Sequence, residues 1–179
     1  VALFIHNNRV YGLTKGQYSP TSPKGFKSKT SPPPKGALER PLNPLAIALA
    51  AGATFVARAW SGDVRHLIDM MVAAIEHPGA ALLDIFQPCV VFNPQYGFDY
   101  FRERVYKLEE NGHDPGDRDA AWAKAQEGED HLPIGVIYRA EGVPAYEDQV
   151  PALQAGPLVD QPLRRWTESD YIRLEAEYV

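Results

Sequence analysis

The sequence predicts an α/β fold with a parallel sheet flanked by helices, and two observations support this prediction. An apolar run, Val1 to Ile5, stops at a polar segment and is typical of a strand covered on both faces in a parallel sheet. Two further apolar runs, over 54–60 and 81–86, alternate with segments of helical spacing. Strand, loop and helix, strand, helix, strand is the order of a parallel sheet with right-handed crossovers.

The segment after the first strand is expected to be a long loop followed by a short helix. Residues 19–41 contain six prolines, so regular structure is not expected there and the segment should cross the rim of the site. Asn43-Pro44 is typical of an N-cap followed by proline at the first helical position. A buried helix is therefore predicted from Leu45 to Ala51, ending at Gly52.

A second helix is predicted between the strands over 54–60 and 81–86. Ser61 or Asp63 can cap its start, and Pro78-Gly79 ends it. One face at helical spacing is expected to point inward, formed by Val64, Leu67, Ile68, Met71 and Ile75. The charged residues Arg65, Asp69 and Glu76 are expected to point outward.

The pattern is weaker beyond about residue 100. A helix is predicted over Asp99–Glu110, partly helical structure around Ala120–Ala125, and a strand over Leu132–Tyr138. The last forty residues alternate proline turns with isolated apolar anchors, namely Leu158, Leu163, Trp166, Tyr171 and Leu174. A tail of this kind is typical of a segment that wraps a partner or its own domain.

Composition excludes several classes of protein. A hydrophobic content of 45% excludes wholesale disorder, and no apolar run reaches membrane-spanning length. The single cysteine cannot form an internal disulfide, which fits a reducing cytosol. We therefore expect a cytoplasmic protein with neither a signal peptide nor a membrane association.

Charge is unevenly divided within the net charge of −5. Residues 9–42 hold seven Lys or Arg against Glu39 alone, whereas residues 99–179 hold nine against eighteen Asp or Glu. We therefore expect a basic loop and an acidic tail as separate surfaces. The basic segment from Lys24 to Arg40 has one aromatic residue, Phe26, in an acidic chain, so we expect no nucleic-acid partner.

Two asparagines follow the first strand directly. In open α/β sheets the ligand crevice lies at the carboxyl ends of the strands, where Asn7 and Asn8 emerge. An asparagine carbonyl is a hard, neutral oxygen donor that suits Mg²⁺ or Ca²⁺ when the ligand brings negative charge, as a diphosphate does. An Asn-Asn pair at a strand end is more often only a turn former, and the pair alone leaves both interpretations open.

The residues that follow carry a family resemblance. The run from Asn7 to Ser22, NNRVYGLTKGQYSPTS, resembles the second half of the thiamine-diphosphate motif in the β subunit of 2-oxoacid:ferredoxin oxidoreductases, above all the 2-oxoglutarate type. The resemblance implies a partial thiamine-diphosphate-binding fold. Residues 1–100 would form the carboxyl-terminal half of that domain, and residues 101–179 an irregular carboxyl-terminal extension. It further implies a missing amino-terminal part of the subunit, which would carry a Gly-Asp-Gly segment.

The resemblance also assigns cofactor and substrate residues. It implies that Asn8 binds Mg²⁺ through its side chain and Val10 through its backbone carbonyl, with Tyr11 and Gly12 beside them at the thiamine diphosphate. The charged magnesium ligand would be the aspartate of the Gly-Asp-Gly segment, outside this chain.

Lys15 is the candidate for substrate recognition. Its flanking glycines give the backbone freedom for a close approach to a ligand, although from local composition a solvated surface lysine is an equal alternative. In the family a lysine here implies 2-oxoglutarate as substrate, its amine meeting the distal carboxylate. Leu13 and Thr14 would line the same pocket.

Cys89 lies just after the strand over 81–86. A lone cysteine is ordinarily a small buried hydrophobic residue. In the family, Gln87-Pro88-Cys89 matches the fourth thiolate ligand of a [4Fe-4S] cluster whose other three cysteines lie near the amino terminus. Those three are absent here, so we expect no cluster in this chain alone.

The histidines share no metal-ligand spacing such as HxxxH and are expected to be structural or exposed, namely His6, His66, His77, His113 and His131. Of these, His6 is close enough in sequence to Asn7 to touch the cofactor rim.

The resemblance implies an enzyme that oxidatively decarboxylates a 2-oxoacid, here 2-oxoglutarate, to acyl-CoA and CO₂ and reduces ferredoxin. Its partners would be an α subunit, ferredoxin, coenzyme A and the 2-oxoacid, and this chain alone would be inactive. The basic loop would then suit the phosphates of coenzyme A.

Two alternatives stay open from the sequence. The first is another thiamine-diphosphate-dependent decarboxylase or synthase, which would use Asn8 but neither Cys89 nor the Lys15 loop. The second is a non-catalytic assembly module that binds a partner through its proline-rich loop and acidic tail.

Overall fold

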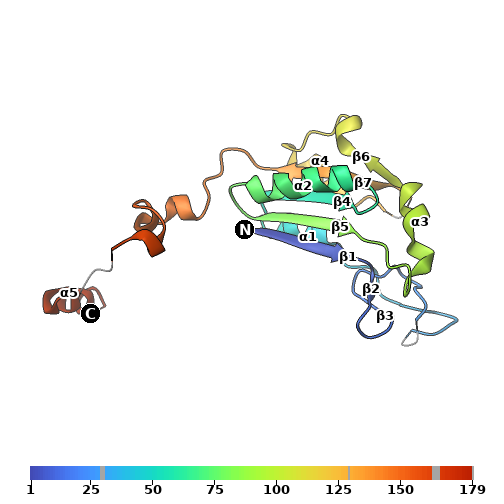
Figure 1. Ribbon diagram of the computed structural model, residues 1–179, viewed down its shortest axis with the longest axis horizontal. Helices are drawn as coiled ribbons and strands as arrows, with labels where there is room; N and C mark the ends of the chain where they lie inside the picture. The colour runs from blue at the N-terminus through green and yellow to red at the C-terminus, as the bar shows by residue number, and fades with distance from the viewer. Residues whose placement is uncertain (29–30, 129, 163–165, 179) are drawn as a thin grey trace. The chain divides into compact units, whose positions relative to one another are not determined.

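The computed structural model describes residues 1–28, 31–128, 130–162 and 166–178. They form two compact units, Val1–Val143 and Pro144–Val179. The first unit contains a five-stranded sheet with helices on both faces (Figure 1), which confirms the predicted α/β class.

The sheet combines parallel and antiparallel pairs. Its strands are β1 (Ala2–Asn7), β5 (Ala81–Phe86), β4 (Phe55–Trp60), β7 (Leu132–Arg139) and β6 (Val105–Lys107), in that spatial order. The pairs β1/β5 and β5/β4 are parallel, whereas β7 runs antiparallel to β4. The carboxyl ends of β1, β5 and β4 therefore meet at one edge, which is the edge where ligands bind in open α/β sheets.

Side-chain caps begin the first two helices at predicted residues, and of the two candidates for the second helix the cap is Asp63 rather than Ser61. Helix α1 (Pro44–Ala50) starts at Asn43, whose side chain accepts a hydrogen bond from the backbone N–H of Ala46. Helix α2 (Val64–Glu76) starts at Asp63, which accepts from the N–H of His66. Such caps satisfy backbone donors that the helix itself leaves unpaired, so they fix where each helix begins.

The core lies on both faces of the central strands. Every residue of β4 and β5 is buried. Along β5, Leu83 packs toward α2 while Leu82 packs toward α1 and α4 (Arg118–Ala125), as the two-residue period of a strand requires. Burying one such side chain contributes about 1.5–3 kcal/mol, so the two strands form a stable platform for the edge above them.

The first strand is less covered than the sequence predicted. Strand β1 lies at the end of the strand order, pairs with β5, and leaves Leu3 55% exposed. The expectation of a strand covered on both faces was wrong. Among its side chains only Asn7 is buried, and Ala2, Leu3 and His6 are exposed. Apolar composition does not reveal whether other elements cover the faces of a strand.

The inward face of α2 was also assigned incorrectly in part. Leu67 and Met71 pack on the sheet together with Ala74, as expected for positions i, i+4 and i+7. Val64, Ile68 and Ile75 were predicted to face inward, but they are 61%, 53% and 64% exposed. The helix is apolar around most of its circumference, so spacing alone could not choose the buried face.

The segment predicted as a helix over Asp99–Glu110 is split. It contains α3 (Phe98–Arg102), strand β6 and a 3₁₀ turn, Leu108–Glu110. Phe101 and Leu108 pack into two different apolar clusters. The break in the helix lets each side chain reach its own cluster. The sheet thus continues past residue 100, while the predicted helix near Ala120 and strand near Leu132 are confirmed as α4 and β7.

The second unit consists of short turns and one helix. Three 3₁₀ turns, Glu147–Gln149, Pro151–Leu153 and Leu158–Asp160, precede α5 (Glu168–Glu177), which the sequence did not predict. Four of the expected apolar anchors are exposed, and Leu163 lies outside the described residues: the exposed four are Leu158, Trp166, Tyr171 and Leu174. Within the described part of the chain, we find no helix with the length and apolarity needed to cross a membrane.

Candidate functional site

A small hairpin follows β1 at the ligand-bearing edge. Strands β2 (Val10–Tyr11) and β3 (Gln17–Tyr18) pair antiparallel, and the N–H groups of Lys15 and Gly16 donate to Gly12 and Tyr11 to close the turn. Lys15 and Gly16 have φ values of 59° and 96°. A left-handed lysine costs free energy, so the turn bonds hold the tip in a defined shape.

Two features of the structure favour glycine at position 16, and the positive φ is the first of them. A Cβ there would lie 3.3 Å from the ring of Phe92, in addition to the strained positive φ. The hairpin therefore lies close against the segment that follows β5.

Next to this hairpin lies a cavity of about 780 Å³. Its wall includes apolar residues of the sheet, Leu3, Ile5 and Leu82, and the loop residues Ser19 and Pro20. Most of the predicted site residues line it, namely Asn8, Val10, Tyr11, Gly12, Leu13 and Thr14. Lys15 is exposed at the tip of the hairpin, beyond the lining residues.

Asn8 is held at both its backbone and its side chain. Its Oδ1 accepts from the N–H of Val10 at 3.1 Å, and its backbone carbonyl accepts from Nδ2 of Asn93 at 3.1 Å. An amide oxygen has two lone pairs, so Oδ1 keeps one for a cation.

The donors fit part of a magnesium site. Asn8 and Val10 offer neutral oxygens, and no group of three or more His, Cys, Asp or Glu that could hold a metal occurs among the described residues. Magnesium is commonly held by few protein ligands together with the phosphates of its substrate. A diphosphate-bound Mg²⁺ therefore suits this donor set, whereas an all-protein metal cage does not.

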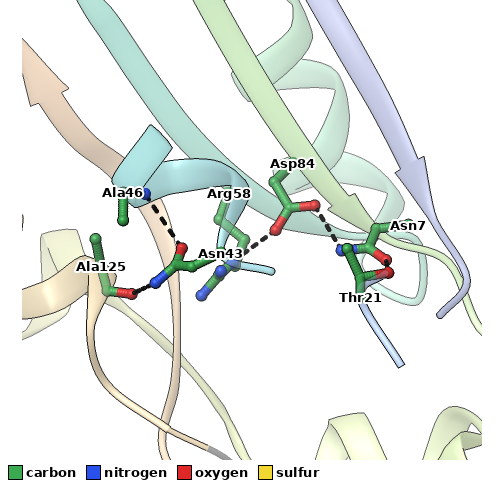
Figure 2. Close-up of polar contacts among 7 residues, drawn as sticks. All are labelled: Asn7, Thr21, Asn43, Ala46, Arg58, Asp84 and Ala125. Atoms are coloured by element: carbon green, nitrogen blue, oxygen red, sulfur yellow. Dashed lines mark hydrogen bonds and ion pairs between the residues drawn. The ribbon is translucent and has the colours of Figure 1, made fainter. Parts of the chain in front are cut away.

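A row of buried polar side chains begins at Asn7, the residue before Asn8 (Figure 2). Asp84, which is fully buried on β5, accepts hydrogen bonds from Asn7 Nδ2 and from Arg58 Nε, both at 3.0 Å. Thr21 in turn donates to Asn7 Oδ1 at 2.8 Å. The row thus connects three neighbouring strands with the proline-rich loop.

The row depends on a buried ion pair. Burial lowers the pKa of Arg58, the adjacent Asp84 carboxylate opposes that shift, and Arg9 lowers this pKa further. A buried pair that loses one partner leaves an uncompensated charge, at a cost of about 3–5 kcal/mol. The sequence did not lead us to predict this row. A signal for it was present, because the strands FVARAW and ALLDIF are otherwise apolar and each contains one charged residue.

Arg9 is anchored on aromatic rings. Its φ is 57°, and its guanidinium carbon lies 5.1 Å from the ring centre of Phe86 and 5.3 Å from that of Phe101. The rings of Tyr96 and Tyr100 lie at 5.6 and 6.0 Å. Each cation–π contact contributes about 0.5–2 kcal/mol, so Arg9 fixes the start of the hairpin against α3 and the turn before it.

Cys89 lies behind the hairpin. It is half-buried and packs with Val10, Phe26 and Ala37, and its carbonyl accepts from the N–H of Asn93 at 2.9 Å. One thiolate does not fit a cluster that needs four, and the described residues bring no others to it. The chain by itself therefore does not fit a [4Fe-4S] cluster.

His6 lines the large cavity, and its Nδ1 lies 2.8 Å from Oε1 of Gln87. His66 is buried on α2, and His113 Nε2 lies 2.8 Å from the carbonyl of Ile137. These positions agree with the expectation of structural or exposed histidines.

Comparisons with known proteins show similarity to one group of enzymes. The family model for the C-terminal TPP-binding domain of thiamine pyrophosphate enzymes matches residues 1–85, and that for the C-terminal part of the pyruvate ferredoxin oxidoreductase beta subunit matches residues 89–155. Subunit beta of 2-oxoacid:ferredoxin oxidoreductase 1 from Aeropyrum pernix is 42% identical over 172 residues, 90% of this chain and 54% of that protein. The 2-oxoglutarate oxidoreductase subunit KorB of Mycobacterium tuberculosis is 48% identical over 113 residues, 60% of this chain and 30% of that protein.

A solved structure is similar over nearly the whole chain. It is 2-oxoglutarate:ferredoxin oxidoreductase from Magnetococcus marinus with 2-oxoglutarate, coenzyme A and succinyl-CoA bound, with a TM-score of 0.80 and 31% identity, over 97% of this chain and 57% of that one. The chain spans about half the length of the curated relatives it matches most fully. On these matches, the chain belongs to the β-subunit family of the 2-oxoacid:ferredoxin oxidoreductases and corresponds to the carboxyl-terminal part of those subunits.

Proposed function

We propose that this chain belongs to an enzyme that oxidatively decarboxylates 2-oxoglutarate to an acyl-CoA and CO₂ and passes the electrons to ferredoxin. The observation that carries the proposal is the Asn8 hairpin beside the cavity of about 780 Å³, at the carboxyl edge of the parallel strands. The names of its relatives, 2-oxoacid and 2-oxoglutarate oxidoreductase β subunits, support this activity. They do not favour another class of thiamine-diphosphate enzyme.

The chain's own part is to hold the diphosphate end of thiamine diphosphate. Asn8 Oδ1 and the carbonyl of Val10 would supply neutral oxygen ligands to Mg²⁺, and Tyr11 and Gly12 would help to hold the diphosphate. Thiamine diphosphate supplies the electron sink that allows CO₂ to leave a 2-oxoacid.

We assign substrate choice to the hairpin tip. Leu13 and Thr14 contact the 2-oxoacid, and the ammonium of Lys15 meets the distal carboxylate of 2-oxoglutarate. The hydroxyl of Thr14 donates to the Tyr11 carbonyl at 3.1 Å, which limits the motion of the tip. The bound 2-oxoglutarate in the Magnetococcus marinus enzyme supports this substrate class.

Further partners follow from the same proposal. Cys89 contributes one thiolate to a [4Fe-4S] cluster whose other ligands come from outside this chain. An α subunit completes the site, coenzyme A accepts the acyl group, and ferredoxin accepts the electrons. The enzyme acts in the cytoplasm, in keeping with a single unpaired cysteine.

The test is the Asn8→Ala variant in the complete α/β complex. Titration of thiamine diphosphate at fixed Mg²⁺ should show affinity reduced by about 10- to 100-fold without loss of folding, and Asn8→Asp should be milder. Asn111→Ala is the control, because Asn111 is exposed and its Nδ2 bonds the Lys107 carbonyl away from the hairpin. Unchanged affinity in Asn8→Ala would refute the ligand assignment.

A further inference from the structure

We propose that Asn93 is a positioning residue that aims Asn8 at the magnesium ion and joins it to the turn that carries Cys89. This inference rests on the proposed function, because it gives Asn93 a role only if Asn8 is a magnesium ligand. Nothing in the sequence pattern singled out Asn93, which lies 85 residues away from Asn8.

Asn93 contacts both elements directly. Its Nδ2 donates to the backbone carbonyl of Asn8 at 3.1 Å, and its backbone N–H donates to the carbonyl of Cys89 at 2.9 Å. Its own carbonyl accepts from the N–H of Tyr96 at 3.1 Å. Only 1% of Asn93 is exposed, so water does not compete for these bonds.

The bond to Asn8 controls the direction of a peptide group. The carbonyl of Asn8 belongs to the peptide that leads into Arg9, whose φ of 57° is unfavourable for a residue with a side chain. A hydrogen bond to that carbonyl holds the peptide in this strained orientation. Without it, the peptide can rotate, and the two ligand oxygens on either side, Asn8 Oδ1 and the Val10 carbonyl, change their relative direction.

The side-chain oxygen of Asn93 indicates that stability alone does not account for an asparagine at this position. Its Oδ1 is buried and has no hydrogen-bond partner among the residues that the structure describes. A leucine of similar size would avoid that unpaired oxygen, so the donor bond to Asn8 is what asparagine contributes here.

A neighbouring contact supports the same segment. Phe92 packs beneath Gly16, where an added Cβ would lie 3.3 Å from the ring. Residues 92 and 93 thus support the tip and the base of the hairpin. They belong to the part of the chain that matches the oxidoreductase-specific model, whereas the hairpin belongs to the part that matches the general thiamine pyrophosphate model.

The experiment compares Asn93→Leu and Asn93→Asp in the complete complex. Both variants lack the amide donor, but the aspartate keeps the shape of the side chain and its Oδ1. We expect the Mg²⁺ concentration for half-saturation with thiamine diphosphate to rise about 10- to 100-fold in both. At saturating Mg²⁺, kcat should return to near the wild-type value, because excess metal restores occupancy. Asn111→Leu, which removes an exposed Asn-to-carbonyl bond, should change neither quantity.

Other outcomes are distinguishable. If Asn8→Ala weakens Mg²⁺ binding but both Asn93 variants bind Mg²⁺ like the wild type, the positioning role is refuted and the proposed function stands. If Asn8→Ala itself has no effect, the magnesium assignment fails first. A loss of kcat that excess Mg²⁺ does not restore, with unchanged half-saturation, would mark Asn93 as merely structural and overturn the proposal.

Discussion

The central strands and the hairpin beside them are stabilised in different ways. Strands β4 and β5 are buried throughout and rest on apolar packing from both faces. The hairpin region depends on individual polar bonds, such as those from Ser22 Oγ to the Arg9 carbonyl at 2.6 Å and from Asn93 to Asn8. Substitutions in the strands should therefore alter global stability, and substitutions in the hairpin should alter binding. The row of Asn7, Asp84 and Arg58 lies where the two regions meet.

The largest effect on stability is expected for a substitution of the charged residue buried in strand β5. Asp84→Ala should lower the free energy of unfolding by about 3–5 kcal/mol, because it leaves the Arg58 guanidinium buried and unpaired. Urea unfolding measures this loss. The double variant Asp84→Leu with Arg58→Met removes both charges and should be clearly more stable than Asp84→Ala. Equal stability of the two would show that the buried charge is not the cause.

Cys89→Ser tests the segment behind the hairpin. If Cys89 is a cluster ligand, the complete complex should lose visible absorbance and iron, and dye reduction should fall by at least about a hundredfold, while thiamine diphosphate still binds. Iron analysis and viologen reduction measure the two quantities. Wild-type iron content and dye reduction would make Cys89 only a packed thiol, in line with its contacts to Val10 and Phe26.

Lys15→Ala should separate binding from stability most cleanly. The side chain is exposed, so unfolding should change little, but KM for 2-oxoglutarate should rise about tenfold or more. KM for pyruvate, which has no distal carboxylate, should hardly change. Lys24→Ala, at another exposed lysine of the basic loop, is the control. Equal changes for both substrates would show that Lys15 does not read the distal carboxylate.

The smallest effect is a pH dependence at the start of α2. Lys107 and the N–H of His66 lower the pKa of Asp63 by hydrogen bonding, so the folded state favours the ionised carboxylate. This contribution is present above the unfolded pKa near about 4 and is lost as pH falls through the lowered folded value. Asp63→Ala should cost about 1 kcal/mol at pH 7 and progressively less below about pH 4.

Asp63→Asn is the matched control for this titration. It keeps an N-cap acceptor and should retain most of the stability at neutral pH. The part of the pH dependence that comes from Asp63 should be absent from this variant. The free energy of unfolding should be plotted against pH for the wild type and for Asp63→Asn between pH 2 and pH 7. If the two plots are parallel, the linkage to Asp63 is contradicted.

The sequence was sufficient for elements with local signals. Asn43-Pro44 predicted the start of α1, and Asp63 was one of two residues predicted to cap α2, the other being Ser61. Such signals are local, because a cap depends on residues only three positions apart. The strand over Ala81–Phe86 was predicted with its observed bounds, because a buried central strand is apolar throughout apart from Asp84. Most hairpin residues predicted from the family motif line one cavity, although their roles stay predictions.

The rest depended on contacts between distant segments. That Asp84 meets Arg58 follows from strand register, which pairs the two positions across β4 and β5, and no short sequence window contains that register. The same holds for Asn93, whose importance arises from a contact with Asn8 far away in the chain. The incorrect inward assignment of Ile68 came from a helix that is apolar on more than one side.

The position of β1 at the end of the sheet has a practical consequence for handling the protein. A strand with one neighbour leaves half of its backbone hydrogen-bonding groups available along the outer edge, and here Leu3 adds an exposed apolar side chain. Such an edge is a template for strand addition between molecules. We therefore expect the isolated chain to self-associate through this edge as its concentration rises, so dilute solutions should preserve its folded form best.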